Sequence, residues 1–301
     1  MLRSALFRAL LLLLLLPPAY GGPVALVLNQ PGGPYAEYAR TLGEQLDPAR
    51  FPLSLHASPE QFPGPAPGTE LIIAAGTEAL RQALARHGNT PILAVLLPRQ
   101  NYERVLAEHS KLRIRISAIY LDQPPGRLAA FVRLLLPQQK RVGLLLSQDT
   151  RPQFAALRQA LGQQGLHADS EDSDSDTNLL PALNNLFARN NILLAIPDGS
   201  IYKRENIRSI LVTSFRYQKP VIAFSSAFVQ AGALAGLYST PAQIARQTAE
   251  LLTQSGANLP PPMPPNQFAI SINQNVAESL GLSLPDEGTL RRALLQDREA
   301  R

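Results

Sequence analysis

Short apolar runs alternate with amphipathic segments along most of the chain. In the first half, the apolar runs predict strands at 24–29, 53–57, 70–75, 92–97 and 116–121. The segments 35–46, 77–86 and 101–109 carry apolar residues at helical spacing instead. In the first of these, Tyr35, Tyr38, Ala39 and Leu42 follow the i, i+3, i+4, i+7 pattern of one helix face.

The second half of the chain repeats the scheme. The predicted strands lie at 142–147, near His167, and at 192–196, 221–225, 236–238 and 268–272. The predicted helices lie at 151–164, 179–189, 205–217, 241–254 and 273–280, with Thr240 as the N-cap of the fourth. Regular alternation of strand and helix predicts parallel sheets built from right-handed βαβ units. We therefore expect an α/β protein with two Rossmann-like lobes.

The first residues predict export from the cytoplasm. Arg3 and Arg8 precede an apolar run over 9–16 that includes seven consecutive leucines. Pro17 and Pro18 follow the run, and small residues flank Tyr20. This order is typical of a secretory signal peptide, which we assign to 1–21. The alternative is an uncleaved anchor, but the run is shorter than the ~20 residues that span a bilayer. We therefore expect the periplasm as the location.

Composition narrows the possible partners. The chain has no cysteine, so it has neither a disulfide nor the residue that would carry a lipid anchor. The net charge is +5, but the basic residues are spread out and form no stripe with aromatic residues. We therefore do not expect nucleic acid as a partner.

The motifs of common enzyme classes are missing from the sequence. The turn after the first predicted strand reads NQPGGP at 29–34, and its prolines remove N–H groups that a phosphate site would need. The sequence has no nucleophile elbow and no HExxH motif. Its histidines, which have no partner motif, are better explained as surface residues. We expect no catalysis, no cofactor and no bound metal.

An acidic segment at 169–176 resembles a calcium loop only superficially. Asp172, Asp174 and Asp176 have alternate spacing, but Thr177 replaces the required glycine and Leu183 replaces the final glutamate. We interpret the segment as a solvated loop.

Ligands of open α/β sheets bind at the carboxyl ends of the strands, so the residues just after each predicted strand are the candidates. Thr77 suits an anion or caps a helix, and Asp198 suits an amine or caps a helix; for Asp198 we favour ligand contact. Tyr202 would add an aromatic wall. The ligand-binding residues that we predict are Asn29, Gly76, Thr77, Arg99, Asp198, Ser200, Tyr202, Ser225 and Ser226.

Several stretches resemble a known family. They are RVGLLL at 141–146, LAIPD at 194–198, KPVIAFS at 219–225, AGALAG at 231–236, and QFAISIN with AESLGL at 267–282. These stretches resemble the periplasmic substrate-binding proteins of ABC transporters whose better-known members bind tryptophan and related amino acids. Where family members often carry Thr-Asp-Pro or Ser-Asp-Pro after the fourth strand, this chain has Leu97, Pro98 and Arg99. Arg99 would there meet an anionic group, which indicates a divergent branch.

The resemblance implies a type I periplasmic binding fold, in which two hinged lobes hold a ligand between them. On that basis we expect 22–122 with 239–258 to form the first lobe. We expect 123–238 with 259–285 to form the second lobe, and 286–301 a C-terminal tail. The resemblance also implies a small-molecule ligand, such as an amino acid or a related compound. It implies an inner-membrane ABC permease as the partner, and we expect the protein to be a monomer. The alternative is a ligand-sensing module coupled to a membrane receptor or kinase.

Overall fold

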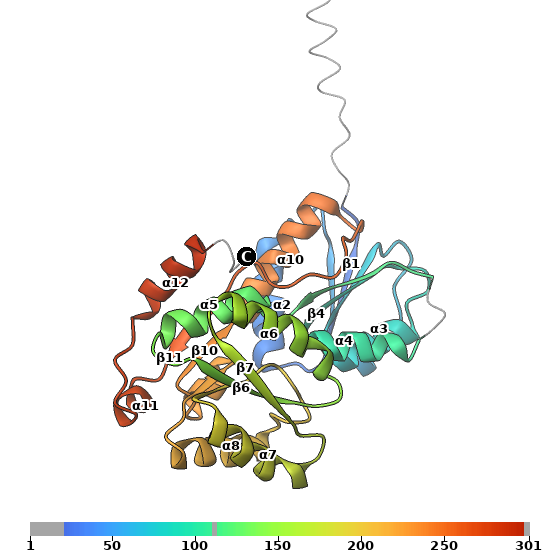
Figure 1. Cartoon of the computed structure of the whole chain (residues 1–301). Helices are drawn as coiled ribbons and strands as arrows, with labels where there is room; N and C mark the ends of the chain where they lie inside the picture. The colour runs from blue at the N-terminus through green and yellow to red at the C-terminus, as the bar shows by residue number, and fades with distance from the viewer. Residues whose placement is uncertain (1–20, 110–112, 298–301) are drawn as a thin grey trace, which may run out of the picture.

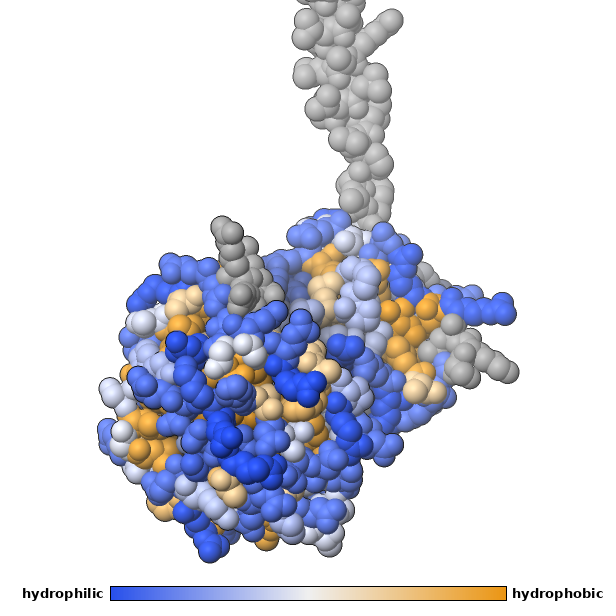
Figure 2. Space-filling view, viewed as in Figure 1, coloured by the Kyte–Doolittle hydropathy of each residue, from blue (hydrophilic) through white to orange (hydrophobic). Residues whose placement is uncertain are grey.

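The structure is a computed structural model that describes residues 21–109 and 113–297. The predicted signal peptide therefore lies outside the described residues except for Gly21. In the part of the chain that is described, no helix combines the length and apolarity that a membrane span needs. Figure 2 shows that hydrophilic residues cover most of the face seen in Figure 1, with hydrophobic residues in smaller patches.

The first lobe is built on a five-stranded parallel sheet with the order β2-β1-β3-β4-β5. Its strands are β1 (Val24–Leu28), β2 (Leu53–His56), β3 (Leu71–Ala75), β4 (Ile92–Leu97) and β5 (Ile116–Tyr120). Its helices are α2 (Gly33–Gln45), η1 (Pro59–Gln61), α3 (Thr77–Ala85) and α4 (Arg99–Ala107). Every residue of β1, β3 and β4 is buried, which explains their continuous apolar runs.

The second lobe is built on a six-stranded sheet with the order β11-β10-β9-β8-β6-β7, in which only the β10–β11 pair is antiparallel. Its strands are β6 (Arg141–Leu146), β7 (His167–Asp172), β8 (Ile192–Leu194), β9 (Val221–Ala223), β10 (Ala235–Tyr238) and β11 (Ala269–Ile272). The helices after β5 are α5 (Pro125–Leu135), η2 (Arg151–Gln153), α6 (Phe154–Gln163), α7 (Asp176–Arg189), α8 (Arg204–Arg216), α9 (Ser226–Gln230), α10 (Pro241–Ser255), α11 (Gln274–Ser279) and α12 (Glu287–Gln296).

The chain passes between the two sheets three times (Figure 1). It leaves β5 for α5, which packs in the core of the second sheet. It returns from β10 to α10, whose Ile244 and Ala245 pack with the first sheet and α2. It then runs beside β5, where Met263 pairs in parallel with Ile119, before it enters β11.

The predicted lobe boundaries stay a prediction, and packing differs from them in two places. Leu259 and Met263 pack in the core of the first sheet, although we assigned 259–285 to the second lobe. The N–H of Met263 donates to the carbonyl of Ala118 at 2.9 Å, which ties the proline-rich segment to β5. In the predicted tail, Leu290 and Leu294 of α12 are buried in the core of the second sheet.

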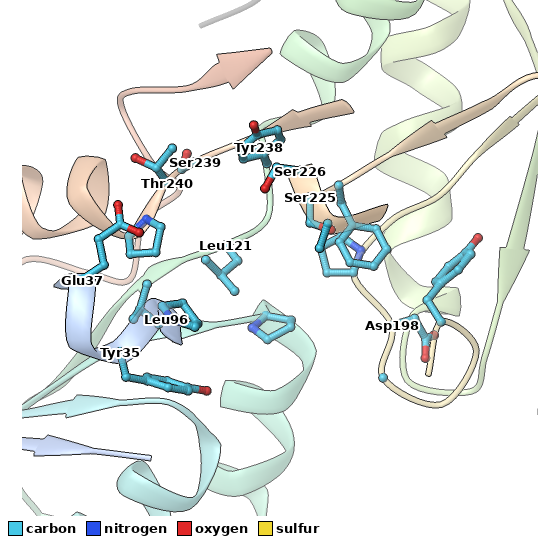
Figure 3. Close-up of a pocket in the computed structure, with 18 residues that line it drawn as sticks. Tyr35, Glu37, Leu96, Leu121, Asp198, Ser225, Ser226, Tyr238, Ser239 and Thr240 are labelled. Carbon is cyan, nitrogen blue, oxygen red and sulfur yellow. The ribbon is translucent and has the colours of Figure 1, made fainter. Parts of the chain in front are cut away.

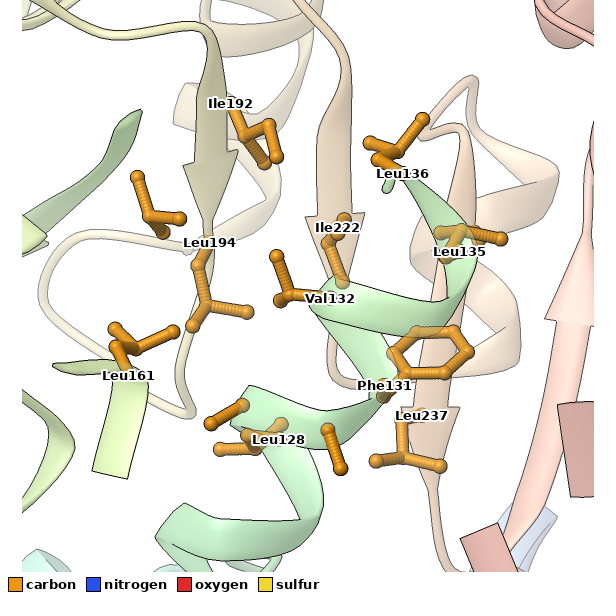
Figure 4. Packing of buried hydrophobic residues seen from close by; sticks show 14 of the residues in the cluster. Leu128, Phe131, Val132, Leu135, Leu136, Leu161, Ile192, Leu194, Ile222 and Leu237 are labelled. Atoms are coloured by element: carbon orange, nitrogen blue, oxygen red, sulfur yellow. The ribbon is translucent and has the colours of Figure 1, made fainter. Parts of the chain in front are cut away.

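The largest core cluster lies between α5 and the second sheet (Figure 4). Leu128, Phe131 and Val132 of α5 pack against sheet residues that include Leu194 and Ile222. All five of these side chains are buried, and each stabilises the fold by roughly 1.5–3 kcal/mol on an area basis. α5 was not among the helices predicted from the sequence.

The prediction of a solvated loop over 169–176 is wrong at 169–172 and at Asp176, and only residues 173–175 are in a loop. Six residues from His167 to Asp172 form β7 at the sheet edge, and α7 begins at Asp176. Arg189 pairs with Asp169 (2.8 Å) and Glu171 (2.6 Å), so cations on neighbouring elements neutralise the acids that we assigned to solvent. A row of charges also keeps an exposed edge strand from pairing with other chains.

Candidate ligand-binding cleft

A pocket of about 610 Å³ opens between the two lobes at the carboxyl ends of their strands (Figure 3). This volume is in the range of small-molecule sites. The first lobe contributes the start of α2 and the ends of β4 and β5. The second contributes the ends of β8 and β9, and the crossing from β10 to α10 closes one side. The lining residues are Pro34, Tyr35, Glu37, Leu96, Pro98, Leu121, Pro197, Asp198, Gly199, Tyr202, Phe224, Ser225, Ser226, Ala227, Tyr238, Ser239, Thr240 and Pro241.

Apolar and aromatic groups form most of the walls. Leu96 and Leu121 line the first-lobe side together with the ring of Tyr35 (Figure 3). Across the pocket, Tyr202 and Phe224 lie edge to face with ring centroids 5.5 Å apart. Both rings also contact Phe228, so the second-lobe wall is backed by a packed aromatic cluster.

Asp198 is buried and fully engaged in hydrogen bonds within the second lobe. The hydroxyls of Ser147 and Thr150 donate to its Oδ2 at 2.6 and 2.8 Å. Ser200 donates to its Oδ1 from the backbone N–H (2.9 Å) and from the hydroxyl (2.6 Å). Burial alone would raise the pKa of Asp198, but these hydrogen bonds outweigh it and lower the pKa below its ordinary value. Asp198 thus joins the loop after β6 to the loop after β8.

Glu37, which the sequence analysis did not select, is in the opposite situation. It lies in α2, and its carboxylate points toward the side of the pocket that Ser239 and Thr240 line (Figure 3). The structure gives it no hydrogen bond or ion pair with any residue in the described ranges. Glu37 is the fifth residue of α2, the helix that follows β1, so the strand-end rule would have found it only if extended into the second turn of that helix.

A buried polar cluster ties the three crossings together. The amide of Gln123, on the first crossing, donates to the hydroxyl of Ser239 at 2.8 Å. That hydroxyl in turn donates to the carbonyl of Gln267, on the third crossing, at 2.5 Å. Arg127 of α5 donates to the Gln123 side chain (2.8 Å) and to the carbonyl of Pro265 (3.0 Å). This shared cluster therefore joins all three segments that connect the lobes.

The predicted first-lobe residues have partners outside the pocket. Asn29 accepts the N–H of Glu78 at 2.9 Å and so caps the start of α3. Gly76 has a φ of +105°, and an added Cβ would lie 2.7 Å from that of Asn29. The hydroxyl of Thr77 accepts from the amide of Asn101 at 3.1 Å. None of these predicted residues lines the pocket, and their contact with a ligand stays a prediction.

Of the other predicted residues, four line the pocket, Arg99 lines a second cavity, and Ser200 lines neither of the two. Tyr202, Ser225 and Ser226 line the pocket together with Asp198, whereas Ser200 does not. Arg99 lines a second cavity of about 580 Å³ and pairs with Glu103 at 2.7 Å. Ser225 also accepts the N–H of Phe228 and caps α9. The ligand role of each of these residues stays a prediction.

Asp122 lies at the second cavity, directly after β5. Its Oδ2 accepts the backbone N–H of Arg99 at 2.7 Å, while its buried Oδ1 has no hydrogen-bonding partner among the described residues. Burial raises the pKa of Asp122 to about 6, against the opposing effect of the Arg99 hydrogen bond. Within 21–109 and 113–297, no three His, Asp or Glu side chains are grouped as metal ligands would be.

Solved structures share this architecture. A ligand-free, open substrate-binding protein with adhesive properties from Clostridium difficile matches with a TM-score of 0.64 and 14% identity, over 88% of this chain and 96% of that one. A conserved domain protein from Vibrio cholerae matches with a TM-score of 0.61 and 14% identity, over 90% and 97%. An ABC domain in complex with L-Trp from Streptococcus pneumoniae matches with a TM-score of 0.60 and 13% identity, over 90% and 98%.

The chain therefore has the two-lobed type I periplasmic-binding-protein fold, as the resemblance implied. At these identities the comparison shows the fold alone. No protein-family model matches the sequence, and no curated protein does either.

Proposed function

We propose that this protein is an exported solute-binding protein, which captures a small molecule between its lobes and presents it to an ABC permease. The observation that carries the proposal is the pocket itself. Both lobes line it at the carboxyl ends of their strands, where ligands of open α/β sheets bind. Its walls are mainly apolar and aromatic, with few polar groups, as is typical of small-molecule sites.

Closure around the solute is the proposed mechanism. Tyr35 and Leu96 belong to the first lobe, while Phe224 and Ser226 belong to the second. A solute that contacts both sets gains contacts when the lobes approach, so it shifts the population toward the closed form. Asp198 is assigned a positioning role, since its hydrogen bonds hold the loop that leads to Tyr202.

The neighbours and the N-terminus support the remaining parts of the proposal. The protein from Streptococcus pneumoniae was solved with L-Trp, and the one from Clostridium difficile is a substrate-binding protein. The apolar run over 9–16 supports export to the periplasm. We place the protein there as a monomer that binds without catalysis, through neither cofactor nor metal.

Binding is tested with the chain from Gly22 onward and a panel of amino acids, nucleosides, sugars, amines and organic acids. A cognate solute at 100 times its Kd is expected to add about 2.7 kcal/mol to the free energy of unfolding. Phe224→Ala is expected to weaken binding of that solute, and Phe215→Ala, an aromatic control that is 59% exposed on α8, is not. The proposal fails if no solute stabilises the protein, or if both variants bind like the parent.

Transport is tested by deleting the gene and measuring uptake of the solute that binds. Lost uptake supports delivery to a permease. If uptake persists and only the transcriptional response to the solute is lost, the protein is instead a ligand-sensing module coupled to a membrane receptor or kinase.

A further inference from the structure

The polar groups of the pocket fall into two sets, those with partners inside the protein and those without. Asp198 accepts hydrogen bonds from Ser147, Thr150 and Ser200. Of the hydroxyls, that of Tyr238 contacts the hydroxyl of Ser271 at 2.6 Å. Ser239 belongs to the cluster at the crossings, and Thr240 caps α10 in a capping box with Gln243. The hydrogen-bonding capacity of these groups is therefore used by partners within the protein.

The second set is small and carries one charge. Among the described lining residues, Glu37, Tyr35 and Ser226 have no hydrogen bond or ion pair through their side chains, and the hydroxyl of Tyr202 is buried without a hydrogen-bonding partner. The hydroxyl of Ser225 accepts the N–H of Phe228 and retains its proton for donation. The available side chains are therefore one carboxylate and a few hydroxyls.

The charge of the lining contrasts with that of the whole protein. The chain has a net charge of +5, yet no lysine, arginine or histidine is among the residues that line the pocket. Its ionisable carboxylates are Glu37 and Asp198, one on each side. Arg99, one residue beyond the lining residue Pro98, faces the second cavity and pairs with Glu103. The field in the pocket therefore favours a cation.

From these observations we infer the chemical class of the solute, and the inference rests on the proposed function: the pocket takes a protonated amine with an apolar or aromatic body, and Glu37 is the counter-ion of its ammonium group. Tyr35, Leu121 and Phe224 contact the body. An organic anion would meet two carboxylates and no cation. A sugar would present more hydroxyls than the available side chains can satisfy.

A matched series of probes separates charge from shape. Tryptamine, tryptophan, tryptophol and indole-3-propionate share the indole ring system. At neutral pH they are a cation, a zwitterion, a neutral molecule and an anion, respectively. Calorimetric titration of the parent is expected to rank their affinities in that order. The inference is overturned if tryptophol or indole-3-propionate binds as tightly as tryptamine.

Glu37→Gln tests the counter-ion directly. It is expected to weaken tryptamine binding about 10- to 100-fold, because a hydrogen bond to a charged group is lost. The affinity for tryptophol is expected to change less than about threefold, since that probe has no charge. Glu44→Gln, on the same helix but exposed and paired with Arg40, is the matched control and keeps the parent's affinities. Equal tryptamine affinity in Glu37→Gln and the parent overturns the inference.

The outcomes also distinguish this inference from the proposed function. If a sugar or an organic acid from the wider panel binds and no amine does, the solute class is wrong but the protein still binds a solute. If neither the panel nor the series binds, the proposed function fails, and the inference with it.

Discussion

The two carboxylates that line the pocket come from opposite lobes and have opposite surroundings. Asp198, on the second lobe, is 3% exposed and accepts hydrogen bonds at both oxygens. Glu37, on the first lobe, is half-buried and has no partner among the described residues. Both carboxylates line the pocket, but the neighbours of each one decide whether it is available to a ligand.

Asp122 lies between these extremes, with one oxygen hydrogen-bonded and the other buried without a partner in the described chain. The three carboxylates thus form a series, from one that is hydrogen-bonded at both oxygens to one that has no hydrogen bond within the described chain. The series predicts that removal of the charge will destabilise the protein at Asp198, stabilise it at Asp122, and leave stability nearly unchanged at Glu37.

The largest effect is expected at Asp198. Asp198→Ala removes a buried acceptor and leaves the hydroxyls of Ser147, Thr150 and Ser200 without their partner. We expect a loss of about 2–4 kcal/mol in the free energy of unfolding, measured by urea denaturation at pH 7. A loss below about 1 kcal/mol together with abolished solute binding would instead identify Asp198 as a ligand contact.

At Asp122 we expect the opposite effect: replacing the carboxyl group stabilises the protein, and the size of this stabilisation depends on pH. Its pKa is about 6 in the folded protein, against 3.8 for an ordinary aspartate, so the folded form holds the proton more tightly. Stability from this group is therefore complete below pH 3.8 and is lost as the pH rises through 6. Asp122→Asn, which can still accept the N–H of Arg99, is expected to be more stable than the parent by about 1–3 kcal/mol at pH 8.

That gain is expected to shrink as the pH falls from 7 to 4, where the parent becomes protonated. Unfolding curves of both proteins across this range provide the measurement. Parallel stability profiles for variant and parent would show that the Asp122 carboxyl does not titrate as its burial indicates.

The hydroxyl of Ser239, an uncharged group at the crossings, is expected to have an intermediate effect on the free energy of unfolding. Ser239→Ala leaves the amide of Gln123 and the carbonyl of Gln267 without their shared partner. We expect a loss of about 1–2 kcal/mol in the free energy of unfolding, measured by thermal denaturation. The matched control is Ser279→Ala, where an exposed hydroxyl bonds to Val276 in the same helix, with a loss below about 0.5 kcal/mol. Equal losses of stability at both positions would show that the buried hydrogen bonds of Ser239 do not stabilise the fold more than an exposed hydrogen bond does.

The smallest effect on stability is expected at Glu37. Glu37→Gln removes no hydrogen bond or ion pair within the described chain, so its free energy of unfolding should differ from the parent's by less than about 0.5 kcal/mol. Thermal denaturation without solute is the measurement. A loss above about 1 kcal/mol would show that Glu37 stabilises the fold, and would remove the contrast with Asp198.

The strands were predictable because burial on both faces leaves a simple signature. The apolar runs at β1, β3, β4 and β6 are each almost entirely buried, as continuous hydrophobicity implies. α5 was missed for a related reason. Residues from Arg127 to Val132 are all buried, so in this helix the burial is continuous rather than confined to the spaced positions of one face.

The site was predictable only on one side. The strand-end rule selected Asp198, Tyr202, Ser225 and Ser226, which line the pocket. It missed Glu37 because that residue lies within a helix rather than directly after a strand. The sequence also contains little signal for which carboxylate is satisfied, since two of the partners of Asp198, Ser147 and Thr150, lie 51 and 48 residues away.

The most direct test of the account is a crystal structure of the protein with the solute that stabilises it most. The account predicts that the solute lies in the 610 Å³ pocket, in contact with Tyr35 of one lobe and Phe224 of the other, with the lobes closer together than without solute. A solute bound in the cavity beside Asp122, or bound to one lobe alone with no closure, would contradict it.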